Sequence, residues 1–220
     1  MNKINTKTGR IIAHLEAWLI DHEILRVFYR NFFKLSDQAF RSNHPSPRFI
    51  RKLHKKYGLK TIISMRAADK TGQYQLEKEA CEQLGIQLIN HKMSSSSFPD
   101  AEDVLEAKKI LQTAKTPLLI HCKSGADRAG LMSVFYKHFV EGEPIREAVK
   151  QLSMKYGHFR WAETGKLDVF FDEFLKFEKA HPEVTFEEWV KHHYDKQALN
   201  QQFHAKGWAN IVVNKILHRE

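Results

Sequence analysis

The sequence predicts an α/β fold with a central, mostly parallel sheet of about four to five strands flanked by helices, and with helical extensions at both ends. Strand-like and helix-like segments alternate between residues 35 and 120. The short run Leu118-Leu119-Ile120 is wholly apolar, which is typical of a strand covered on both faces. Beyond Gly130 the apolar residues follow helical spacing only. Such a pattern indicates a parallel sheet followed by a helical third.

The individual elements follow from local signals. Short apolar, β-branched runs predict strands, and apolar residues spaced by three or four and ended by Gly or Pro predict helices. A helix through Trp189 begins at an expected capping box formed by Thr185 and Glu188. The expected strands cover 35–41, 59–65, 86–90 and 118–120. The other expected helices cover 10–34 with a break near Asp21, a segment from Pro47 to Tyr57, 73–84, 100–115, 131–140, 144–156, 167–179 and 209–218.

Charge is distributed unevenly along the chain. Residues 1–60 carry 13 Lys/Arg and 4 Asp/Glu, so the whole formal net charge of +9 lies in this segment. A positive field favours acidic partners, such as phosphorylated proteins, phosphorylated small molecules or anionic membranes. No nucleic-acid recognition motif accompanies the basic residues, so a nucleic-acid partner is not expected.

Composition and the N-terminal region predict a cytoplasmic protein. With 42% hydrophobic and 28% charged residues the chain has a globular profile, and two cysteines are too few for a disulfide framework. The apolar stretch 11–20 contains His14 and Glu16 and is too short to span a bilayer. Residues 1–34 are expected to form a basic amphipathic helical extension. Its apolar stripe either packs on the protein core or rests peripherally on an anionic membrane.

The segment 118–130 contains the residues expected to bind an anion and to act on it. An apolar strand ends at His121, and a helix is expected to begin near Arg128, so the N–H groups between them can form a concave nest that receives an anion. Gly125 permits the unusual backbone conformation such a nest needs. A helix N-terminus and a neighbouring cation favour the thiolate form of Cys122, and Arg128 offers a planar pair of donors to phosphate oxygens.

His121-Cys122, five residues and then Arg128, with Gly125 inside, resembles the signature of the protein tyrosine and dual-specificity phosphatases. Residues 40–47 and 59–66 are similar to bacterial and plant-fungal atypical dual-specificity phosphatases. The resemblance implies the tyrosine/dual-specificity phosphatase fold, with a catalytic domain over 35–160 and a helical C-terminal extension over 161–220 packed on it. It implies Cys122 as the nucleophile and no metal or cofactor. The implied phosphate-binding residues are Lys123, Ser124, Gly125, Ala126, Asp127 and Arg128.

The resemblance also implies supporting residues, and this chain departs from the family pattern at two places. His121 is expected to hold the loop, and Arg66 to pair with Glu79. Family members usually have Ser or Thr where this chain has Ala129, and the interval 91–97, where the general acid is expected, lacks a carboxylate. Three aspartates are candidates for the acid: Asp127 in the loop, which we favour, then Asp100 at a helix start, and Asp69.

Three functions stay open at this point. The chain is expected to be a phosphatase that hydrolyses phosphomonoesters through a cysteinyl phosphate, with protein tyrosine or dual-specificity substrates as the first hypothesis. Lys123 at the loop rim favours phosphoinositides or inositol phosphates as the alternative. Ala129 and the missing upstream acid favour a phosphate-binding pseudophosphatase as the second alternative.

Cys81 and His158 have two interpretations each, whereas the adjacent pair His192 and His193 has one. Cys81 is either a small core residue or a disulfide partner of Cys122. His158, with its neighbours Arg160 and Trp161, either lines the cleft or forms a surface turn. His192 and His193 are adjacent and cannot share one helix face, so no metal site is expected there.

Overall fold

The computed structural model describes residues 30–66 and 71–205. Of the helices predicted over 10–34, residues 10–29 lie outside the described residues, and the prediction is wrong for Phe33 and Lys34, which begin a strand. The helix predicted over 209–218 and the candidate acid Asp69 also lie outside the described residues. Within these limits, the predicted α/β class is confirmed. The protein has a five-stranded sheet between helical layers.

The sheet has the strand order β1-β2-β5-β3-β4. All neighbouring strands are parallel except the β1–β2 pair. The strand predicted over 35–41 is in fact this antiparallel hairpin, because the chain reverses at Asp37 and Gln38. The strands are β1 (Phe33–Ser36), β2 (Ala39–Ser42), β3 (Thr61–Ser64), β4 (Gln87–Asn90) and β5 (Leu118–His121).

Strand β5 lies at the centre of the sheet. It pairs with β2 on one side and β3 on the other, and all four of its residues are buried. A central strand fixed by two neighbours cannot shift its register without breaking both ladders. The loop that follows His121 therefore starts from a rigid support.

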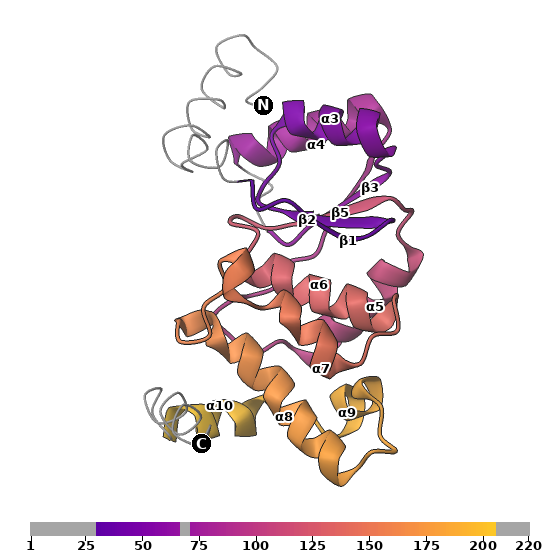
Figure 1. Cartoon of the computed structure of the whole chain (residues 1–220). Helices are drawn as coiled ribbons and strands as arrows, with labels where there is room; N and C mark the ends of the chain where they lie inside the picture. Colours follow the sequence, from indigo (N-terminus) through magenta and orange to yellow (C-terminus); the bar gives the residue numbers. More distant parts are fainter. Residues whose placement is uncertain (1–29, 67–70, 206–220) are drawn as a thin grey trace.

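Two helical layers cover the sheet (Figure 1). Helices α3 (Pro47–Tyr57) and α4 (Gly72–Leu84) lie on one face, and α5 (Ala101–Thr113) and α6 (Asp127–Phe139) lie on the other. Each face has its own apolar cluster. Cys81 belongs to the cluster under α3 and α4, whereas Cys122 belongs to the other cluster, so Cys81 is a core residue. Both cysteines are free.

The C-terminal helices form a further layer beyond α5 and α6 (Figure 1). They are α8 (Lys166–Ala180), α9 (Phe186–His192) and α10 (Lys196–Ala205). The capping box predicted at Thr185 and Glu188 is present and starts α9. These helices are joined to the main core by a set of buried aromatic side chains: Phe135, Phe170, Phe171, Phe174, Phe186 and Trp189.

The single helix predicted over 144–156 is wrong. The segment contains α7 (Ile145–Ala148) and two short 3-10 turns, Val149–Gln151 and Met154–Tyr156. The helix ends because Leu152 leaves the helical conformation and turns into the core, where it packs against Gly130. This break frees the Gln151 carbonyl oxygen for a partly buried contact with Arg41, described below.

Within residues 30–66 and 71–205, no helix combines the length and the apolar character needed to cross a membrane. Phe32, an apolar residue of the predicted N-terminal extension, packs on Phe40 and Phe49.

Candidate active site

The loop between β5 and α6 surrounds the sulfur of Cys122. The Gly125 N–H donates to Sγ at 3.2 Å, and the Ala126 N–H donates to the Ser124 hydroxyl at 3.3 Å. Cys122 is only 2% exposed, whereas Lys123 and Ser124 are exposed at the rim. The sulfur thus lies buried at the base of a loop whose Gly125 N–H is directed toward it.

Gly125 is required by two separate features of the loop. Its φ of +78° lies in the left-handed region, which side chains disfavour. A Cβ at this position would also lie 2.6 Å from the Asn43 nitrogen and 2.6 Å from the Ser42 carbonyl carbon. Both contacts are with backbone atoms, which cannot move aside as a flexible side chain could. The loop therefore needs glycine at this position.

Arg41, a residue the sequence did not single out, supports the loop from behind. It is completely buried on β2. Its guanidinium donates to the carbonyl oxygens of Gly125 at 2.8 Å, Ala126 at 3.0 Å and Gln151 at 2.7 Å, and it stacks on Tyr156 at 4.1 Å. The break in the predicted helix 144–156 provides the Gln151 acceptor.

Asn31 contacts one further carbonyl of the loop and one outside it. Its side-chain amide donates to the Ser124 oxygen at 3.0 Å and the Tyr156 oxygen at 2.8 Å. In a planar trans peptide the C=O and the next N–H point in opposite directions. Since the Ser124 carbonyl faces Asn31 and the Gly125 and Ala126 carbonyls face Arg41, the following three N–H groups point the other way. Arg41 and Asn31 therefore orient the nest.

Arg128 is positioned by the end of β3. Its Nη1 donates to the Met65 carbonyl oxygen at 3.1 Å, and the Met65 N–H in turn donates to the His121 carbonyl at 2.9 Å. One hydrogen bond leaves most of the guanidinium donors for a ligand, because the group carries five N–H donors. The arginine is thus held beside the loop with donor capacity remaining.

Of the predicted partners, Arg66 lies two residues after the end of β3 and Glu79 lies on α4. Arg66 donates from Nη1 to the Gln73 side chain at 2.8 Å, and Glu79 accepts from Gln83 at 3.4 Å. The carboxylate beneath the loop is Glu77, two residues earlier on α4 and 1% exposed at its side chain. Its position in the sequence could have been found from the four-residue period of the helix face that includes Gln73.

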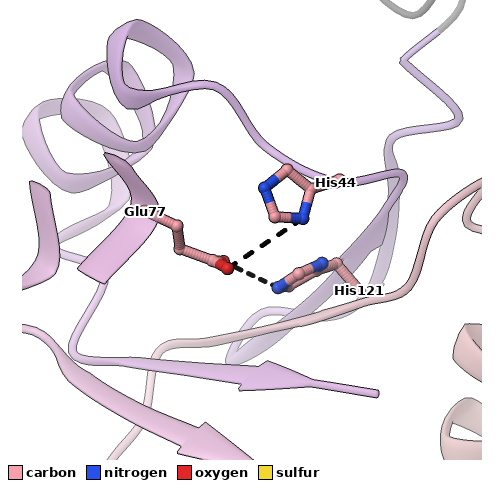
Figure 2. A group of neighbouring side chains, drawn as sticks. All are labelled: His44, Glu77 and His121. Atoms are coloured by element: carbon pink, nitrogen blue, oxygen red, sulfur yellow. Dashed lines mark ion pairs between the residues drawn. The ribbon is translucent and has the colours of Figure 1, made fainter. Parts of the chain in front are cut away.

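Glu77 forms a buried cluster with two histidines (Figure 2). Its Oε1 lies 2.7 Å from His121 Nε2, and its Oε2 lies 3.9 Å from His44 Nδ1. Burial alone would raise the pKa of Glu77, but the histidines and Arg66 outweigh it and hold the pKa below its ordinary value. The other ring nitrogen of His121 lies 3.4 Å from the Cys122 carbonyl oxygen. This placement fits the predicted supporting role of His121.

The same cluster has the residue types of a metal site, two histidines and a glutamate. Their ligand atoms lie within 4.8 Å of one another. Two ligands of one zinc ion, each about 2.1 Å from the metal, lie roughly 3.4 Å apart in a tetrahedral site. The contact of 2.7 Å between Glu77 and His121 is shorter and has the length of a charge-assisted hydrogen bond. The arrangement fits an ion pair better than a metal centre.

Asp127, the favoured acid, contacts a histidine from the C-terminal side. His158 Nδ1 lies 2.7 Å from Asp127 Oδ1, and His158 Nε2 lies 2.7 Å from Asp168 Oδ2 on α8. Burial alone would lower the pKa of His158, but its two carboxylate partners raise the pKa to about 9. Of the two interpretations of His158, the structure supports the one that places it near the loop.

This histidine should make folding stability depend on pH. A raised pKa stabilises the fold below the unfolded value of about 6.5, and this stabilisation is lost as the pH rises through about 9. The free energy of unfolding should therefore fall by about 3 kcal/mol more in the wild type than in His158→Gln between pH 6 and pH 10. Urea unfolding of both proteins measures the difference, and parallel pH curves would contradict the ion pair.

Asp100, the alternative acid, is the N-cap residue of α5 but makes no side-chain capping bond. Its carboxylate accepts from Lys196 Nζ at 2.7 Å instead. Two neighbouring carbonyls also contact C-terminal residues: Ser96 accepts from Lys166 at 3.0 Å, and Pro99 accepts from Tyr194 at 2.8 Å. C-terminal residues thus hold the segment 96–100, of which Ser96 belongs to the interval 91–97 where the general acid is expected.

Comparison with solved structures identifies the fold. A crystal structure of Pseudomonas aeruginosa TpbA in complex with pTyr matches with a TM-score of 0.54 at 21% identity, over 70% of this chain and 92% of that chain. The core catalytic domain of the PP-IP phosphatase SIW14 from Saccharomyces cerevisiae matches with a TM-score of 0.52 at 20% identity, over 69% and 93%. These likenesses show that the chain has the fold of the tyrosine/dual-specificity phosphatases.

Sequence comparison identifies the family. Residues 50–166, just over half of the chain, match the family described as DSP-PTPase phosphatase fused to NAD+ kinase, and the chain belongs to this family. The dual specificity protein phosphatase TpbA of P. aeruginosa is 27% identical over 131 residues, which is 59% of this chain. The match covers 55% of that relative, so the chain spans about half its length. The predicted resemblance is confirmed.

Proposed function

We propose that this protein hydrolyses phosphomonoesters through a cysteinyl-phosphate intermediate on Cys122. The observation that carries the proposal is the 3.2 Å hydrogen bond from the Gly125 N–H to Sγ, in a loop whose next N–H groups face the same side. Such donors favour a thiolate, and they also favour the equatorial oxygens of a phosphoryl group next to it.

The proposed reaction has two steps. In the first, the thiolate attacks phosphorus, the S–P bond forms as the P–O bond breaks, and the leaving oxygen takes a proton from an acid, which we assign to Asp127. Arg128 and the N–H groups of residues 123–128 stabilise the charge on the transferring group. In the second, water attacks phosphorus and releases the thiolate. Ala129 offers no hydroxyl to this second step, although the Ser124 hydroxyl lies within the loop.

Phosphotyrosine and other phosphorylated protein side chains are the first proposed substrates. The TpbA structure in complex with pTyr supports this choice by fold likeness. Inositol phosphates or phosphoinositides are the second, supported by exposed Lys123 at the loop rim and by the likeness to SIW14. An exposed basic face on α3 adds to the attraction for either: Arg51, Lys52, Lys55 and Lys56.

We also propose a cytoplasmic location, with residues 10–34 as the contact to an anionic membrane surface. The concentration of positive charge in residues 1–60 supports this contact. A panel of phosphopeptides, soluble inositol phosphates and phosphoinositide vesicles tests both the substrate and the surface. Vesicles that neither retain the protein in flotation nor serve as substrate would remove the membrane proposal.

Burst kinetics separate an enzyme from a phosphate-binding pseudophosphatase. With 4-nitrophenyl phosphate we expect about one nitrophenol per protein in a fast phase, followed by a slower steady rate limited by phosphoenzyme hydrolysis. Ala129→Ser should increase that steady rate by restoring a hydroxyl at this position. A fast phase with no steady rate would support the pseudophosphatase, and absence of both phases would overturn the proposal.

A further inference from the structure

Asp127, His158 and Asp168 form a continuous hydrogen-bonded series between the catalytic loop and α8. Both contacts are 2.7 Å long, and His158 is 1% exposed. We propose that His158 stores the proton that Asp127 delivers to the leaving oxygen, and that Asp168 holds the imidazole in place for this transfer. The proposal deepens the proposed function and rests on it.

The surrounding backbone and side chains fix His158 in this position. Its N–H donates to the Ser153 carbonyl at 3.1 Å, and Gly157 before it has a φ of +78°. Asp168 is itself contacted by Arg160, whose Nη1 lies 4.0 Å away and whose other nitrogen pairs with Asp172. The charged groups around the imidazole are therefore two contacting carboxylates and a more distant Arg160–Asp172 pair.

The charges explain why a stored proton is needed. An ionised Asp127 beside a phosphate dianion would repel it and could not act as an acid. When His158 carries a proton, the three groups together have a net charge of −1 and hold one proton that Asp127 can accept across a single hydrogen bond. An approaching dianion raises the affinity of Asp127 for that proton, so substrate binding itself prepares the acid.

The proton and electron pairs balance in both steps. As the thiolate forms the S–P bond, the proton moves from His158 Nδ1 to Asp127 and from Asp127 to the oxygen of the breaking P–O bond, which leaves His158 neutral with Nε2–H on Asp168. As water attacks the phosphoenzyme, the S–P electron pair returns to sulfur. The released proton then passes through Asp127 back to His158.

Asp168, the last group of the hydrogen-bonded series, borders a cavity. Asp168, Arg160 and Asp172 line a cavity of about 500 Å³ beside α8, so the side of Asp168 away from His158 lies near solvent. By contrast, the carboxylate of the rival acid Asp100 accepts from the ammonium of Lys196 at 2.7 Å, and a lysine ammonium is a less ready proton donor than an imidazolium. The geometry thus favours Asp127 as the group through which the proton passes.

Leaving-group dependence tests the proposal. Nitrophenolate leaves without a proton, whereas phenolate needs one. His158→Gln should therefore lower kcat/KM for phenyl phosphate about 100-fold but that for 4-nitrophenyl phosphate less than about 5-fold. Asp127→Asn should show the same selectivity. Equal losses on both substrates would overturn the relay and indicate a structural role.

The pH profile and a second variant keep the test decisive. Wild-type turnover of phenyl phosphate should fall above about pH 9, where His158 loses its proton. In Asp168→Asn this fall in turnover should begin at a lower pH. Asp168→Asn also replaces His158→Gln as the test if the latter does not fold. If turnover fell at the same pH in Asp168→Asn and in the wild type, the proposed proton transfer from His158 through Asp127 would be wrong. Failure of the proposed function is distinct, because the wild type would then release no nitrophenol, or release it equally in Cys122→Ser.

Discussion

Replacing Cys122 with serine is expected to reduce turnover by at least about 10⁴-fold while phosphate binding is kept. A serine hydroxyl at this position is not ionised and attacks phosphorus far more slowly than a thiolate. The Gly125 N–H, the N–H groups that follow it and Arg128 stay in place, so the loop still binds the anion. Steady-state assays with 4-nitrophenyl phosphate and titration calorimetry with inorganic phosphate measure the two effects separately.

Cys81 provides the matched control. It is 1% exposed in the apolar cluster on the other face of the sheet, and burial, followed by the charges of Glu77 and Glu82, raises the pKa of its thiol to about 12. Cys81→Ala should therefore retain turnover. If Cys122→Ser stayed active, or if Cys81→Ala lost turnover with its fold intact, the assignment of the nucleophile would be wrong.

The parallel part of the sheet was predictable because each strand has a local apolar signature and a clear ending. The β1–β2 hairpin was not, since its turn at Asp37 and Gln38 lacks the Gly or Asn that usually marks a two-residue reversal. The end of the helical segment before Leu152 could not be predicted from the sequence either. Helical spacing continues through the segment, and only tertiary packing against Gly130 turns Leu152 inward.

The site was predictable where its residues are consecutive. Residues 121–128 run without interruption from the end of β5 to the first turn of α6, so the sequence indicates the nucleophile, the nest and Arg128 together. Arg41, Asn31 and Glu77 come from distant segments, and their partners are mainly backbone carbonyls or a buried histidine. Contacts with backbone carbonyls leave no spacing pattern in the sequence, and the four-residue spacing of Gln73 and Glu77 indicates a shared helix face but not that this face meets His121. The identity of the acid needed the same long-range information, because His158 lies 31 residues after Asp127.

Arg128→Lys is expected to lower kcat by on the order of 10³-fold, although the positive charge is kept. The guanidinium donates one bond to the Met65 carbonyl and can still direct a planar pair of N–H groups at two phosphate oxygens. A lysine ammonium that replaces it has no planar pair, so it stabilises the ground-state dianion better than the flattened transition state. The loss should consequently appear in kcat more than in KM.

The control for this variant is a lysine substitution outside the site. Arg51 is exposed on α3, and Arg51→Lys should leave kcat and KM unchanged within about 2-fold. A loss in Arg128→Lys confined to KM would mean that residue 128 binds phosphate only as a point charge. The transition-state contact would then have to come from the N–H groups of residues 123–128 alone, and the geometry imposed by Arg41 and Asn31 would become the main source of catalysis.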